Sequence, residues 1–137
     1  MIIKIKIDRQ KAESLFEMAN LREKYFSETE FEKVPTMVIE NYYEIIKELA
    51  SALILLDGFK SIGENSHKYL IDFLEKYKFS DGEIVFLHDL RIKRNKSSYE
   101  GKRIDYSYLK EKKDKIEEII KKLKLLIKNK LIDIKEK

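Results

Sequence analysis

One apolar segment constrains the fold of this chain more than any other feature. Between Pro35 and Gly58, two neighbouring stripes of apolar side chains recur at helical spacing. The first stripe consists of Val38, Tyr42, Ile45, Leu49, Ala52 and Leu56, and the second of Ile39, Tyr43, Ile46, Ala50 and Leu53. A helix that is apolar over most of its circumference must be surrounded by other elements. The segment therefore predicts a central helix with Pro35 in its first turn and Gly58 at its end.

Capping residues predict helices on both sides of this segment. Asp8 can cap a helix over roughly residues 9–26, and Ser66 can cap a shorter helix that ends near Tyr77. One side of the first helix carries Ala12, Leu15, Ala19, Arg22 and Phe26. The intervening "GFKSIGENS" is predicted to be a loop.

Two more helices are predicted in the second half of the chain. "SDGE" (Ser80–Glu83) is a capping box, because the serine oxygen and the glutamate can each bond an unpaired amide. The helix that it opens runs to about Ser98, and Gly101 offers an exit. Asp105 can cap a last helix of up to about thirty residues. Its inward side carries Leu109, Ile116, Ile120, Leu123, Ile127, Leu131 and Ile134.

These segments predict an all-α fold in a single domain over residues 1–137. Four glycines and one proline leave little material for turns, which favours long helices with short links. We expect an up-and-down bundle of four long helices plus a shorter one. "MIIKIKI" (residues 1–7) alternates apolar residues with lysine and suits an extended arm or an edge strand, and residues 128–137 are a helix end prone to fraying.

The composition excludes several classes of site. No cysteine is present, so thiolate metal sites and disulfides are ruled out, and two histidines cannot build a histidine-rich metal site. "ENSH" (Glu64–His67) has the Glu-x-x-His spacing of di-iron bundles, but those sites need two such motifs. We expect no metal and no cofactor. The longest apolar run, Leu49–Leu56, is too short to span a membrane, and the amino end lacks a secretory signal, so we expect a cytoplasmic protein.

The fourth predicted helix carries an unusual polar stripe. Ile84, His88, Arg91, Asn95 and Ser98 fall within about 80° of arc, on what we expect to be its inward side, with Arg94 on a flank. Inward polar groups must be hydrogen-bonded, line a cleft or meet a partner. The spacing leaves open a polar layer that fixes helix register, or a helix rolled so that these groups reach water. Arginines in a cleft can grip phosphate in a forked geometry.

Basic charge concentrates in two segments of the chain. Residues 91–103 hold six basic residues and one acidic residue, and residues 110–137 hold eleven basic and six acidic residues. Such surfaces are compatible with an anionic partner such as RNA. The alternative is that these lysines merely solvate exposed helix faces.

"RNKSSY" (Arg94–Tyr99) resembles the motif of HEPN-domain proteins, whose nuclease members carry an arginine, four to six intervening residues and a histidine. "NYYEIIKELASALILLDGFKS" (Asn41–Ser61) is similar to the second helix of that family, and "SHKYLIDFL" (Ser66–Leu74) to the start of its next helix. The resemblance spans roughly residues 41–126. It implies a dimer with a cleft built from two copies of the motif helix.

The resemblance also assigns candidate roles. If the chain is catalytic, Arg94 and Tyr99 are the catalytic pair, with Tyr99 standing where the nucleases have histidine. Tyrosine, with an ordinary pKa of about 10, is a poor base near neutral pH. The phosphate-binding candidates are Arg91, Arg94, Asn95, Lys96, Ser98 and Arg103. His88 is an accessory candidate, although a lone histidine on an inner face is more often a bonded core residue, and His67 matches an architectural position.

The resulting hypothesis is a HEPN-like dimeric module that binds RNA or a nucleotide in a basic polar cleft. It would belong to a toxin–antitoxin or defence system, with weak or absent ribonuclease activity. Whether it is a metal-independent endoribonuclease is left open. The alternative is a non-catalytic interaction module that pairs with a nucleotidyltransferase-type partner. A third reading is an unrelated four-helix scaffold.

Overall fold

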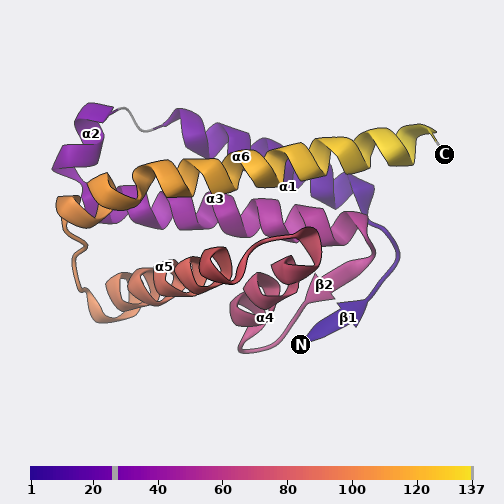
Figure 1. Ribbon diagram of the computed structural model, residues 1–137, viewed down its shortest axis with the longest axis horizontal. Coiled ribbons are helices and arrows are strands. Elements are labelled where there is room, and N and C mark those ends of the chain that lie inside the picture. The colour runs from indigo at the N-terminus through magenta and orange to yellow at the C-terminus, as the bar shows by residue number, and fades with distance from the viewer. Residues whose placement is uncertain (26–27, 137) are drawn as a thin grey trace.

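Helix α3 (Pro35–Leu56) runs through the middle of the computed structural model (Figure 1). The structure describes the backbone of residues 1–25 and 28–136 and the side chains of residues 1–25 and 31–134. Pro35 occupies the first turn, and fourteen of the 22 residues are buried. The predicted central helix is therefore confirmed. Its buried side chains join both stripes, because other helices pack around it on several sides.

The long helices form an all-α bundle, as predicted. Helices α1 (Arg9–Lys24) and α6 (Tyr106–Glu136) pack along α3, and α5 (Asp81–Glu100) packs on another side with α4 (Ser66–Phe73). Each long helix runs antiparallel to the long helix before it in the chain (Figure 1). Helix α6 buries Leu109, Ile116, Ile119, Ile120, Leu123 and Ile127. It continues through the segment predicted to fray, as far as Glu136.

Capping residues set the start of α1 and both ends of α5. The Asp8 carboxylate accepts from the Lys11 amide at 3.1 Å, as predicted for the start of α1. Both bonds of the predicted capping box are present, with Glu83 N to Ser80 Oγ at 3.1 Å and Ser80 N to Glu83 Oε1 at 2.9 Å. Helix α5 ends at Gly101, which adopts a left-handed conformation with φ of 68°.

The predicted start of α4 is wrong by one residue. Asn65, not Ser66, is the N-cap of α4, which gives way at Leu74–Tyr77 to a turn of 3₁₀-helix. Helix α1 ends at Lys24, two residues before Phe26, near which or a little beyond which its end is predicted; Phe26 lies outside the described residues. A short helix, α2 (Glu28–Lys33), was not predicted; its buried Phe31 packs edge-on against Tyr42, with ring centres 5.9 Å apart.

The amino-terminal arm forms a two-stranded sheet with part of the predicted loop. Strand β1 (Ile2–Lys4) pairs antiparallel with β2 (Phe59–Ser61), so that Ile3 lies opposite Lys60. The loop prediction is therefore wrong for Phe59–Ser61, since three residues are too few to show a period. Gly58 is required here: its φ is 79°, and an added Cβ would lie 2.9 Å from the Ile5 carbonyl oxygen.

Candidate functional site

The polar stripe of α5 lies at the edge of its buried side. The side chains that enter the core are those of Phe86, Leu87 and Leu90. The predicted stripe is half-buried or exposed instead and faces α3 and α4, so the expected inward orientation is wrong. Instead, the side of α5 that carries the apolar residues Phe86 and Leu90 packs into the core. Most of the stripe's polar groups are nevertheless bonded to neighbouring helices or to one another.

His88 is held by contacts to its neighbours. Its Nε2 lies 2.6 Å from the Asp72 carboxylate of α4, and its Nδ1 accepts from Arg91 Nε at 3.4 Å. These two contacts use both ring nitrogens. His88 thus ties α5 to α4 and orients Arg91, which fits the structural role that a lone histidine usually has.

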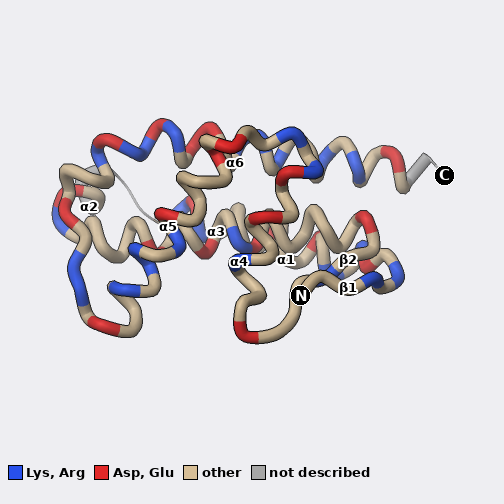
Figure 2. Tube along the Cα trace, turned by 60° about the horizontal axis from the view of Figure 1, so that its bottom comes forward, with Lys and Arg blue, Asp and Glu red and all other residues tan. Residues whose placement is uncertain are grey.

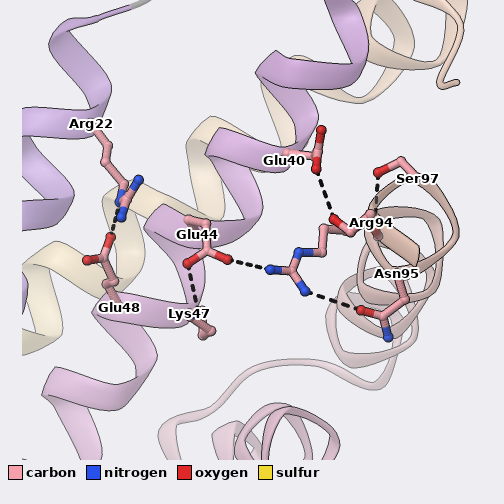
Figure 3. A network of polar contacts seen from close by, with 9 residues as sticks. Arg22, Glu40, Glu44, Lys47, Glu48, Arg94, Asn95 and Ser97 are labelled. Carbon is pink, nitrogen blue, oxygen red and sulfur yellow. Dashed lines mark hydrogen bonds and ion pairs between the residues drawn. The ribbon is translucent and has the colours of Figure 1, made fainter. Parts of the chain in front are cut away.

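Arg94 is paired with an acidic side chain of α3. Its guanidinium donates to Glu44 at 2.9 Å and to the Asn95 amide oxygen at 3.4 Å, and only 18% of its side chain is exposed (Figure 3). It also lies 5.5 Å from the centre of the Tyr43 ring. The other Glu44 oxygen is 2.7 Å from Lys47 Nζ. One turn after Arg94 on α5, the Ser98 hydroxyl donates to Glu40 of α3 at 2.9 Å.

These charges shift the pKa values of the surrounding groups. Burial raises the pKa of Tyr43 to about 12, against the opposing effect of Arg91 and Arg94. Burial alone would raise the pKa of Glu44, but the hydrogen bond and charge of Lys47, with Arg94 and Arg22, hold it below its usual value. Burial, followed by the charge of Lys47, lowers the pKa of His67. At neutral pH the cluster therefore contains a charged Glu44 and a neutral His67.

Sequence reasoning missed the α3 side of this cluster. Glu40, Glu44 and Lys47 lie three or four residues apart and interrupt the apolar surface of α3 along one line. Polar side chains in that line predict that a polar side of another helix packs against α3 there. The line indicates neither which helix approaches nor which of its side chains are paired.

The exposed side of α5 carries three large side chains at heptad spacing. Val85, Ile92 and Tyr99 are 68%, 43% and 78% exposed. Residues seven apart fall on nearly the same side of a helix, so the three form an apolar row, called here the outer stripe. Tyr99 follows Arg94 by five residues, about 140° around the helix. Within one chain, the proposed catalytic pair therefore points in different directions.

A basic hollow lies where α5 passes into α6. Its volume is about 440 Å³, and its basic lining residues are Lys93, Lys96, Lys102 and Arg103, with Asp105 and Glu111 as the acidic ones. The charge-coloured Cα trace shows basic positions on both sides of the turn that joins α5 to α6 (Figure 2). Lys93 Nζ lies 4.6 Å from the centre of the Tyr108 ring. Lys96, Lys102 and Arg103 form no ion pair with any carboxylate among the described residues.

The predicted site residues thus fall into two groups. Arg91, Arg94, Asn95, Ser98 and His88 face α3 and α4, where most of them are bonded within the protein. Lys96 and Arg103 line the basic hollow. The structure does not bring all of them together in one cleft of a single chain.

No three His, Asp or Glu side chains of the described residues lie close enough together to hold a metal ion. Over the same residues, no helix has the length and apolar content needed to cross a membrane. Comparisons with protein-family models, with curated proteins and with solved structures found no match to this chain. The HEPN resemblance stays a prediction that rests on the sequence motifs.

Proposed function

We propose that the protein binds RNA through the basic hollow at the end of α5. The observation that carries this proposal is that Lys96, Lys102 and Arg103 line one concave surface and form no ion pair with the described carboxylates. Phosphates are attracted to such a surface regardless of base sequence, because contact with lysine or arginine releases counterions. Tyr99, exposed on the same helix one turn after Lys96, offers a ring on which a base can stack.

The motif suggests that Arg94 binds phosphate, but in this proposal Arg94 joins α5 to α3. Glu44 neutralises it, so a phosphate would have to displace that carboxylate before it could bind. Tyr99 points away from Arg94, and its hydroxyl has no hydrogen-bond partner among the described residues. These two facts support weak or absent ribonuclease activity. The exposure of Tyr99 is compatible with a HEPN-like dimer, in which a second chain would bring its own Tyr99 to the shared surface. The toxin–antitoxin or defence setting is proposed from the sequence resemblance alone.

The test measures binding of a labelled single-stranded RNA at several salt concentrations. Lys96→Ala/Arg103→Ala removes two cations of the hollow, and Lys110→Ala/Lys128→Ala removes two exposed lysines of α6 as a matched control. We expect only the first double variant to bind weakly and to depend less on salt, with the log–log slope reduced by roughly 0.7 for each phosphate that is no longer bound. Equal weakening in both would mean that RNA binds by net charge alone. Absence of binding at low salt would refute the proposal.

A second candidate function is favoured by the outer stripe. Val85, Ile92 and Tyr99 form an exposed apolar row of the kind that another helix can cover. A non-catalytic module that pairs with a nucleotidyltransferase-type protein would use this row. If the folded protein binds no RNA at low salt, this candidate leads.

A further inference from the structure

A separate hollow lies on the side of α3 that faces α1 and α4. Its volume is about 250 Å³, and residues of α1, α3, β2 and α4 line it. Its apolar lining side chains are Leu15, Ile54, Leu55 and Leu70. Its lysines are Lys11, Lys47 and Lys60, one from each of three different elements. None of the residues of the basic hollow contributes to it.

The charges around this hollow do not balance. Lys47 is paired with Glu44 at 2.7 Å, and the one acidic lining residue, Glu48, is paired with Arg22 at 2.5 Å (Figure 3). Lys11 and Lys60 have no carboxylate partner among the residues that the structure describes. The lysines Lys11 and Lys60 therefore leave two positive charges without a described carboxylate partner in a lining that is partly apolar.

The uncharged polar lining groups can add hydrogen bonds. The ring nitrogens of His67 form no hydrogen bond with other described residues, although its ring lies 6.0 Å from that of Tyr43. Burial and the charge of Lys47 lower its pKa, so at neutral pH the imidazole has one donor and one acceptor. Ser51, one turn after Lys47 on α3, offers a hydroxyl group in the lining of the same hollow.

We propose that this hollow binds the phosphate monoester of a small organic molecule. A phosphate monoester carries a charge of about −1.5 to −2 at neutral pH, which matches Lys11 and Lys60, and lysine is a common phosphate ligand. The organic part would rest on Leu15, Leu55 and Leu70. The volume lies below the roughly 300–1,000 Å³ of pockets that hold drug-sized ligands, so that part is limited to a single ring or a short chain.

Calorimetric titration with phenyl phosphate tests the proposal. This probe combines a dianion with one apolar ring, whereas phenol lacks the charge and inorganic phosphate lacks the ring. We expect phenyl phosphate to bind one site per chain and more tightly than either control compound. Lys11→Ala/Lys60→Ala should weaken it on the order of tenfold or more, since two charged hydrogen bonds are removed. Lys110→Ala/Lys128→Ala, which makes the same change in net charge on α6, should leave binding unchanged.

A third variant tests whether the hollow itself is used. Ser51→Leu keeps every lysine but places a larger side chain in the lining of the hollow, so it should weaken phenyl phosphate binding while the thermal unfolding transition stays cooperative. The proposal fails if phenyl phosphate shows no saturable binding, if inorganic phosphate binds equally well, or if both lysine pairs have equal effects. Lys96→Ala/Arg103→Ala should retain phenyl phosphate binding, so the result is independent of RNA binding.

Discussion

The Arg94 guanidinium meets three groups at once: the Glu44 carboxylate, the Tyr43 ring and the Asn95 amide. An arginine in this position joins α5 to α3 because its fork bonds a carboxylate while its planar face covers an aromatic ring. The polar stripe of α5 is thereby explained largely by bonds within the chain. Substitutions of single residues in and near this stripe can therefore be predicted without reference to a binding partner.

Glu44 should make the protein sensitive to acid. Its pKa is held below the ordinary value of 4.5 in the folded state, so the stability it contributes is present above that pH and is lost as pH falls through the folded pKa. Glu44→Gln should therefore flatten the fall in unfolding free energy below about pH 4.5. Chemical denaturation at a series of pH values measures this slope. Glu100→Gln, at an exposed site, is the control, and the same slope in both variants would show that the Glu44 contacts are unimportant.

We propose that Tyr99, in place of a histidine, limits RNA cleavage by the motif. Tyr99→His restores the side chain of the nuclease motif, and a group with a pKa near neutrality is a better proton acceptor than tyrosine. We expect this variant to cut a labelled RNA faster than the natural protein, with a rate that rises with pH near neutrality. Tyr99→Phe should bind RNA nearly as well, because a stacking ring does not need its hydroxyl. Strong cleavage by the natural protein that survives Tyr99→Phe would contradict this view of Tyr99.

At the scale of elements, α3 was the most predictable part of the molecule. It is buried on several sides, so its apolar pattern extends over many turns and leaves no other assignment. Helix α2 and strand β2 were missed because six and three residues are too few to display a period. The partner of β2 also lies near the start of the chain, beyond the reach of any local pattern.

The rotation of α5 was the main error about the candidate site. His88, Arg91 and Asn95 continue the line of Ile84, and spacing within an isolated helix places that line inward. The carboxylates that bond His88 of the stripe and the flanking Arg94 are Asp72 and Glu44, which come from other helices. Glu44 is fifty residues away from Arg94 in the sequence. Pairing across helices depends on tertiary packing, which helical spacing alone does not specify.

Because α3 lies at the centre of the core, we expect a charge on its buried side to unfold the protein. Leu53 is fully buried, so Leu53→Asp would place an unpaired charge in the core, at a cost on the order of the whole folding free energy of about 5–15 kcal/mol. We expect the variant to be unfolded or aggregated by circular dichroism. Met37→Asp, at a position on the same helix that is 57% exposed, should fold normally. A soluble Leu53→Asp protein with a cooperative melt would mean that α3 is not the centre of the core.

At the scale of the whole molecule, Arg94 and Tyr99 lie on different sides of one chain. Arg94 faces α3, whereas Tyr99 and the outer stripe face away from the core of the bundle. Apolar residues repeated every seven positions on an exposed helix favour pairing with a second helix, and a two-fold axis lets one row serve both chains. We propose that two copies associate along α5 with Ile92 at the centre of the seam, so that Tyr99, at the end of the outer stripe, stays accessible near the edge of the interface and two basic hollows come into one assembly.

Sedimentation equilibrium at micromolar concentration tests this claim most directly. The chain has a mass of 16.4 kDa, and we predict a species of twice that mass for the natural protein. Ile92→Glu places a charge in the middle of the outer stripe and should yield a folded monomer, whereas Leu125→Glu, at an exposed position on α6, should remain a dimer. A natural protein that sediments only at 16.4 kDa, or a dimer unaffected by Ile92→Glu, would contradict the claim.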